Sequence, residues 1–128
     1  MKKILWVAGL LIILYSCDKT ETQPYLDGRY IGIFHRTGMD TALINILFDG
    51  SRFEGSSNRQ NYPAICSGSF RLEENSIFFT DSCMWTANFD WSLILAGSYN
   101  INTSDGTVRI WKTNGTVTDE YLLRQPTR

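Results

Sequence analysis

Short segments in which hydrophobic and polar residues alternate make up most of the chain after its first 25 residues. Their hydrophobic positions are rich in Ile, Phe and Tyr, residues that favour β-strands, and turn residues separate the segments. The pattern predicts strands at 29–35 and 42–48, and one long strand at 92–102 that bends at Gly97. It predicts no helix in this part of the chain.

Two-residue turns set the expected pairing of the strands. The candidate turns are Asp49-Gly50, Asp105-Gly106 and Asn114-Gly115. These dipeptides suit hairpins because both central residues of a tight turn need positive φ. The first turn places Phe53 opposite Ile46, and the last places Arg109 opposite Glu120.

About eight antiparallel strands are expected, nearly all joined to their neighbours by tight turns. Such a meander leaves its two edge strands unpaired unless the sheet closes on itself. Eight strands make a barrel whose interior is filled by side chains or holds one small ligand. We therefore expect an all-β fold, an antiparallel up-and-down meander closed into a small barrel. A two-sheet β-sandwich is the alternative, although it usually needs longer crossovers.

Cys66 and Cys83 frame the best-defined hairpin. With Glu74-Asn75 as its turn, Phe70 lies opposite Phe79, and the same register brings Cys66 opposite Cys83. Because alternation and cysteine pairing agree on one register, we expect a disulfide between these cysteines. Two buried free thiols are the alternative.

The beginning of the chain has the composition of an export signal. Two lysines precede an apolar run at 4–15, which is too short for a stable membrane-spanning helix. Residues 14–17, Leu-Tyr-Ser-Cys, resemble the lipobox of bacterial lipoproteins, in which cleavage precedes a cysteine that carries a diacylglyceryl group. We expect a signal peptide at 1–16, then lipidated Cys17 and a polar tether at 17–25. An ordinary secretory signal with an incidental cysteine is the alternative.

This resemblance implies an exported protein that is lipid-anchored to the cell envelope, on the periplasmic or the surface face of the outer membrane. Assigning Cys17 to lipid leaves the other two cysteines as an even pair in an oxidising compartment.

Composition and charge narrow the classes of function. The 128 residues carry a formal net charge of -1, so the clustered positive charge that nucleic-acid binding requires is not expected. The sequence has a single histidine, His35, and neither Cys-x-x-Cys nor Gly-x-Ser-x-Gly. We therefore expect no catalytic residues, no metal and no cofactor, and a monomeric protein.

Three segments resemble the lipocalin-like, or calycin-like, small barrel lipoproteins of Gram-negative bacteria. They are 26–32 (Leu-Asp-Gly-Arg-Tyr-Ile-Gly), 88–95 (Asn-Phe-Asp-Trp-Ser-Leu-Ile-Leu) and 119–124 (Asp-Glu-Tyr-Leu-Leu-Arg). Lipocalins open with Gly-x-Trp, whose Trp plugs the closed barrel end beneath a basic residue from the last strands. The resemblance implies a lipocalin-like barrel at 26–125, with Tyr30 in place of that Trp and Arg109 or Arg124 as the basic partner.

Aromatic and aliphatic residues fall on the faces that should point into the barrel. They are Tyr30, Phe34, Ile44, Ile46, Phe53, Phe70, Phe79, Tyr99 and Ile101. They either fill the core or line a narrow apolar pocket. The first functional hypothesis is a lipid-anchored, non-enzymatic barrel that binds a small hydrophobic ligand.

A second group of aromatic residues is expected at the surface. Tyr62, Trp85, Phe89 and Trp91 lie in or near polar connections, and the polar stretch 55–63 is expected to be an exposed loop. Exposed aromatic residues are typical of binding surfaces. The alternative hypothesis is an envelope interaction or inhibitor module that uses this loop and the aromatic segment 85–91.

Overall fold

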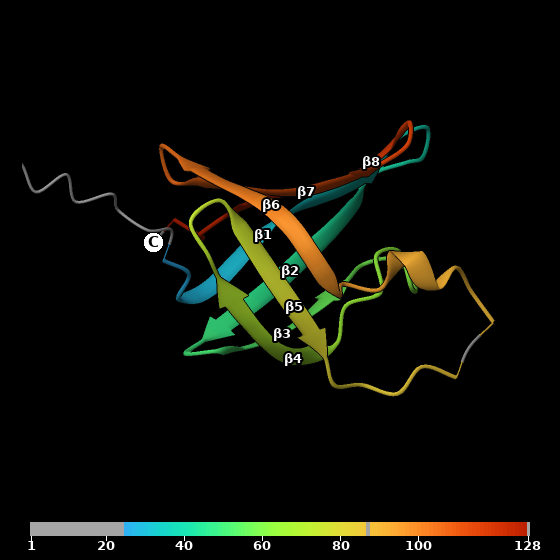
Figure 1. Cartoon of the computed structure of the whole chain (residues 1–128), viewed down its shortest axis with the longest axis horizontal. Coiled ribbons are helices and arrows are strands. Elements are labelled where there is room, and N and C mark those ends of the chain that lie inside the picture. Colours follow the sequence, from blue (N-terminus) through green and yellow to red (C-terminus); the bar gives the residue numbers. More distant parts are fainter. Residues whose placement is uncertain (1–24, 87, 128) are drawn as a thin grey trace, which may run out of the picture.

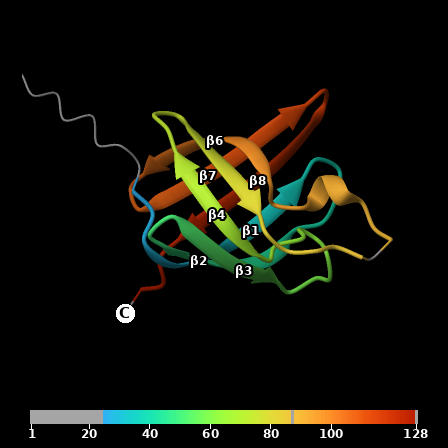
Figure 2. The ribbon, with the colours of Figure 1, turned by 60° about the horizontal axis from the view of Figure 1, so that its bottom comes forward.

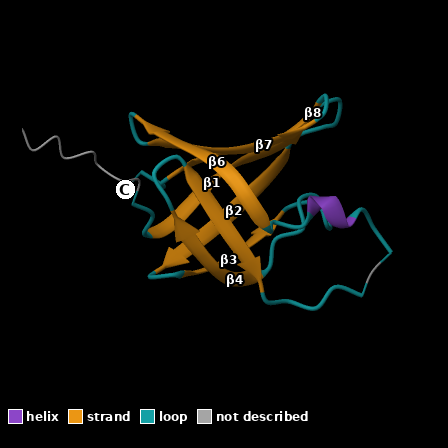
Figure 3. Ribbon diagram, in the orientation of Figure 1, coloured by secondary structure: helices purple, strands orange, loops and turns teal. Residues whose placement is uncertain are grey.

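The computed structural model describes residues 25–86 and 88–127, which form a closed antiparallel β-barrel (Figures 1 and 3). The strands of this part of the chain are β1 (Gly28–Arg36), β2 (Ala42–Asp49), β3 (Arg52–Ser57), β4 (Ser67–Leu72), β5 (Ser76–Asp81), β6 (Gly97–Ser104), β7 (Thr107–Asn114) and β8 (Val117–Arg124). A short 3-10 helix, η1 (Trp91–Leu93), lies between β5 and β6.

Each strand pairs with its neighbour in sequence, and β1 also pairs with β8, so the sheet closes. The up-and-down barrel is therefore confirmed, and the β-sandwich alternative is wrong. Tight turns leave little chain for crossovers, and closure pairs the two strands that would otherwise be edges. Among the described residues, no helix has the length and apolar character needed to cross a membrane.

The barrel has two different ends (Figures 1 and 2). One end, here called the loop end, carries the connections at 37–41, 58–66, 82–96 and 115–116. The other, the terminus end, carries the short turns at 50–51, 73–75 and 105–106, together with both ends of the described chain. Gln125 donates a hydrogen bond to the Asp27 carbonyl there, which ties the two chain ends together.

The barrel interior is filled by side chains. All nine residues predicted to point inward are buried, from Phe34 and Ile46 at full burial to Phe70 at 9% exposure. Successive rings touch across the barrel: Phe53 on Phe79, Phe79 on Tyr99, Tyr99 on Tyr121 and Tyr121 on Phe34, with centroids 4.8 to 6.0 Å apart. Tilted and edge-on aromatic pairs of this kind add to the stabilisation from burial.

Two predicted registers are wrong by two residues. Phe53 lies opposite Phe48 rather than Ile46, and Arg109 lies opposite Leu122 rather than Glu120. The reason is turn chemistry: Gly50 and Gly115 are the first loop residues, with φ of 61° and 64°, so the preceding Asp and Asn stay in the strands. A shift of two residues keeps every side chain on its predicted face.

The Asp105-Gly106 turn forms as predicted. Both residues have positive φ, 50° and 79°, and Ile101 consequently lies opposite Ile110. The hairpin of β4 and β5 also has its predicted register, with Phe70 opposite Phe79.

The predicted strand at 92–102 is wrong in its first half. The Asp90 carboxylate accepts a hydrogen bond from the Ser92 backbone N–H, and this cap starts η1 instead of extended chain. Strand β6 begins only at Gly97, whose φ of 88° allows the chain to bend there.

The expected exposed loop at 55–63 is also partly wrong. Its first three residues belong to β3, and Tyr62 and Pro63 are buried. The chain folds back here because the Tyr62 carbonyl accepts a hydrogen bond from the Ser57 hydroxyl, and Ala64 forms a parallel bridge with Ile94.

Glycines allow close contact between strands at two places. A Cβ at Gly32 would lie 1.8 Å from the Leu122 carbonyl oxygen, and one at Gly68 would lie 1.9 Å from that of Thr80. These distances are far below van der Waals contact, so the backbone could not stay in place if either glycine carried a side chain.

Candidate functional site

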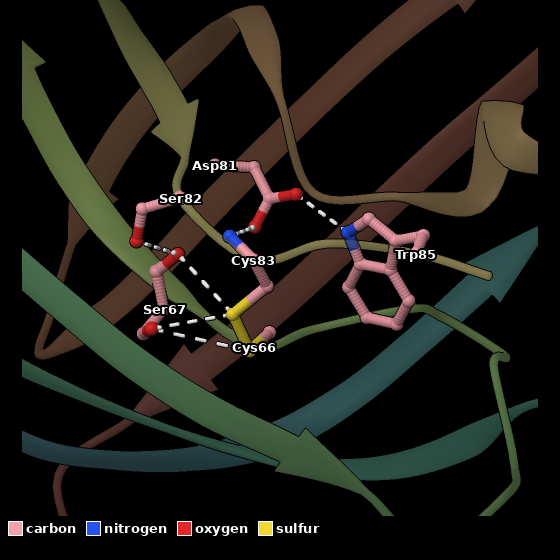
Figure 4. The surroundings of a disulfide bond; sticks show 6 residues. All are labelled: Cys66, Ser67, Asp81, Ser82, Cys83 and Trp85. Atoms are coloured by element: carbon pink, nitrogen blue, oxygen red, sulfur yellow. Dashed lines mark hydrogen bonds between the residues drawn. A yellow bond between two sulfur atoms is a disulfide. The ribbon is translucent and has the colours of Figure 1, made fainter.

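The Cys66–Cys83 disulfide joins two connections at the loop end (Figure 4). The cysteines continue the β4–β5 ladder, in which Gly68 lies opposite Asp81, and their Cα atoms are 6.3 Å apart. The predicted disulfide is therefore confirmed, and the alternative of two free thiols is wrong. It ties the 58–66 connection to the start of the 82–96 connection.

The chain after the disulfide is held by Asp81. This carboxylate accepts hydrogen bonds from the Cys83 backbone N–H at 3.4 Å and from the Trp85 indole Nε1 at 2.5 Å (Figure 4). The first ring of the aromatic segment is thus fixed to the end of β5.

Three of the four predicted surface aromatics come together in one group, here called the aromatic cluster. Phe89 lies between Trp85 and Trp91, with ring centroids 5.7 Å and 6.3 Å away. Trp91 is 57% exposed, and Met84, which precedes Trp85, is 91% exposed. The connection that carries the cluster projects from the loop end of the barrel (Figure 1).

Tyr62 does not belong to this surface. Its ring packs edge-on against Phe34, with centroids 5.2 Å apart, and its hydroxyl donates a hydrogen bond to the Asp40 carbonyl. Its position next to polar residues suggested exposure, but the ring closes the barrel core from the loop end instead.

A charged cluster lies beside η1 and was missed in the sequence. Arg36, at the end of β1, donates to both oxygens of Asp119 in β8 at 2.6 and 2.7 Å. It also donates to the Asp90 carboxylate and to the Ser92 hydroxyl and carbonyl, at 3.1 to 3.3 Å. All five donors of the guanidinium are therefore used. Arg36 connects the first and last strands to the segment that carries the aromatic cluster.

The alternation in β8 contained the signal for this cluster. Asp119 lies on the same inward-facing side of β8 as Tyr121 and Leu123, both of which are buried. A carboxylate on an inward-facing position requires a cationic partner. Arg36 lies on the same side of the neighbouring strand β1 as buried Phe34, directly opposite Asp119.

Lys112 lies at the same barrel mouth. Its ammonium is 4.6 Å from the centre of the Tyr99 ring, and its Cα partner across the ladder is Asp119. Burial lowers the pKa of Lys112, the charge of Asp119 opposes this shift, and the charge of Arg36 adds a smaller lowering. Burial also raises the pKa of Tyr99, whose ring contacts Lys112, and of Tyr121, whose ring packs on Tyr99.

A cavity of about 310 Å³ opens between these groups. It is lined by Arg36, Ser92, Lys112, Asn114, Val117 and Asp119. Ser92 belongs to η1, directly after Trp91, so the cavity and the aromatic cluster are neighbours along the chain.

The two basic residues suggested by the lipocalin resemblance lie elsewhere. Arg124 and Arg109 occupy outward-facing positions, and Arg109 stacks on Trp111 at 4.0 Å and pairs with Glu120 at 2.6 Å. Tyr30 is buried and packs edge-on against Phe48. The expected arrangement of a basic side chain over Tyr30 is wrong, because strand alternation directs both arginines away from the core.

His35 lies opposite Glu120 on the outward phase of β1. No group of three or more His, Cys, Asp or Glu side chains suited to a metal ion occurs within the described part of the chain. The predictions of a cleaved signal peptide, of lipidation at Cys17 and of most of the tether fall on residues outside the described ranges.

Comparison with known protein families, with curated proteins and with solved structures finds no match to this chain. The closed eight-stranded barrel of the described residues is consistent with a calycin-like fold. Membership of the lipocalin-like lipoproteins stays a prediction.

Proposed function

We propose that this protein is an exported, lipid-anchored, non-enzymatic barrel that binds another envelope protein through its aromatic cluster. The observation that supports this function is the grouping of Trp85, Phe89 and Trp91 on one connection, with Trp91 and Met84 exposed. Aromatic residues, tryptophan above all, and methionine are enriched at protein interfaces, where they supply large contact areas.

The attachment of this connection also favours a binding role. The disulfide and the Asp81 carboxylate hold its beginning, and Arg36 holds the residues on either side of Trp91, Asp90 and Ser92. A surface that is already ordered loses less conformational entropy on binding.

The position of the cluster fits a membrane anchor. The described chain begins with Tyr25 at the terminus end, opposite the loop end (Figure 1). A lipid on Cys17 would therefore leave the aromatic cluster on the end of the barrel away from the bilayer. Several acyl chains, as in bacterial lipoproteins, hold a protein durably on a membrane.

The barrel interior offers less support for a hydrophobic ligand. The nine residues expected to face such a ligand are buried, and their rings pack on one another. A ligand inside would have to displace this core, and forcing extra volume into a well-packed core typically costs about 1 to 3 kcal/mol.

Photo-crosslinking in the native host tests the proposal. A photoreactive residue is placed at Met84 or Trp91, and at Phe78 as the control, because Phe78 is a partly exposed ring on the barrel wall. We expect one defined protein to be trapped from 84 and 91 and not from 78. Equal yields of the same adducts from all three positions, or no adduct, would contradict a specific surface at the loop end.

A further inference from the structure

Lys112 lies on the inward-facing side of β7 and forms no ion pair with a carboxylate of the described residues. It follows Val108 and Ile110 on the inner phase of β7, and both of these residues are buried. Asp119 lies opposite it, but Arg36 occupies both oxygens of that carboxylate. Among the described residues, no carboxylate oxygen lies within 4.0 Å of the Lys112 ammonium.

The charges around Lys112 compensate its own charge only in part. Asp119 and Arg36 act on it with opposite signs and are paired with each other. The second carboxylate near the mouth, Asp90, is more than half exposed and bound to Arg36, so solvent screens it. Tyr99, the remaining titratable group in contact with Lys112, is kept neutral because burial raises its pKa.

We propose that the cavity at the loop end binds a carboxylate, with the Lys112 ammonium as its counter-ion. Asn114 and Ser92 line the same cavity and offer polar contacts, while Val117 supplies an apolar wall. A volume of about 310 Å³ admits a small organic acid or one acidic side chain. Burial lowers the pKa of Lys112, as expected of an ammonium that has lost water without gaining an anion.

The carboxylate has two sources, a free organic acid or an acidic residue of the protein that docks on the aromatic cluster. The second source rests on the proposed function and deepens it, because Trp91 and Ser92 are adjacent in η1. A partner would then present an acidic side chain beside an apolar surface.

Lysine NMR of the full chain gives a direct test. The sequence has four lysines, and Lys112 is the only one in the described ranges. The NMR signal that is missing from the spectrum of the Lys112→Met variant is therefore the signal of Lys112. The probes are sodium acetate, sodium 3-phenylpropionate and the capped peptide acetyl-Leu-Glu-Phe-amide, each at constant ionic strength. We expect a saturable shift of the Lys112 signal and a higher Lys112 pKa in the bound state, since an anion favours the charged form.

The arms of the experiment separate the outcomes. Saturation by either small acid supports a free ligand, and saturation by the peptide alone, but not by its Gln counterpart, supports a partner's side chain. The affinity for the probe that binds should fall about tenfold or more in Lys112→Met and stay close to normal in Lys112→Arg. It should stay unchanged in Arg124→Gln, which removes an outward-facing cation. No saturable shift with any probe, or equal affinity in Lys112→Met measured by calorimetry, would overturn the proposal.

Failure of this inference is distinguishable from failure of the proposed function. If crosslinking from position 91 persists at full yield in Lys112→Met and no probe binds, the aromatic surface stands and the carboxylate site is refuted. If the acids bind but position 91 traps nothing, the carboxylate site stands and the docking surface is refuted.

Discussion

Replacing Asp119 by asparagine tests whether the Arg36–Asp119 pair holds the loop end together. The substitution keeps the shape of the side chain and removes its charge. The two bonds to Arg36, at 2.6 and 2.7 Å, lose their ionic partner, while three bonds from Arg36 to Asp90 and Ser92 stay available.

Burial sets the size of the expected effect. The side chains of Arg36 and Asp119 are 11% and 6% exposed, so little water can replace the lost partner. Removing one member of a buried ion pair costs about 3 to 5 kcal/mol, and the bonds that Arg36 keeps favour the lower value of about 3 kcal/mol. In a domain of this size, that loss lowers the melting temperature by about 12 °C.

Asp90→Asn is the matched control. Asp90 binds the same arginine, but its side chain is 59% exposed, so its loss should cost less than about 1 kcal/mol. Urea unfolding followed by circular dichroism, with the disulfide intact in every variant, gives both values. Equal losses below about 1 kcal/mol in the two variants would refute the structural role assigned to the Arg36–Asp119 pair.

Three further predictions concern the barrel itself. Reduction of the disulfide, which spans a sequence separation of 17, should add the mass of two hydrogens and destabilise the fold by about 3 kcal/mol; identical melting with and without reductant would contradict its role. Gly68→Ala should cost about 2 kcal/mol or more because its Cβ would meet the Thr80 carbonyl, whereas Ser69→Ala should melt almost normally; similar melting of the two variants would be inconsistent with that contact. Burial raises the pKa of Tyr99 and Tyr121, so the folded state keeps them protonated and stability should fall as the pH rises above about 10, where unfolded tyrosine ionises. Their ionisation, followed by ultraviolet absorbance, should coincide with unfolding, and ionisation in a protein that still has its β-sheet dichroism would contradict their burial.

Alternation and turn residues were sufficient to predict the barrel and its core. The inward phase of each strand depends only on the period of two, so Phe53 points inward even though its partner is Phe48 rather than Ile46. The cysteine hairpin was predicted in full because its turn, its alternation and its two cysteines all require one register.

Turn geometry was not predictable from dipeptides alone. Asp105-Gly106 and Asn114-Gly115 are equivalent signals in the sequence, yet only the first has positive φ at both residues. In the second, Gly115 with its positive φ begins the loop, and Asn114 remains paired with Val117. The pairing of β7 with β8, and not the dipeptide, therefore determines where β7 ends.

The charged cluster at the loop end depends on contacts between distant parts of the chain. Arg36 and Asp119 are 83 residues apart, and they meet because β1 closes the barrel against β8. The arrangement of η1 depends in turn on Arg36, which binds Asp90 and Ser92. Local patterns identify the aromatic residues of this region but not the ion pairs that position them.

The most direct test of the proposed binding surface is the affinity of the crosslinked partner, once purified, for three forms of the full chain. Calorimetry should show that Trp91→Ala weakens binding by about thirtyfold, as expected of an interface hot spot, whereas Phe78→Ala on the barrel wall binds like the unmodified protein. Equal affinities for all three proteins would contradict the claim that the aromatic cluster at the loop end is the functional surface.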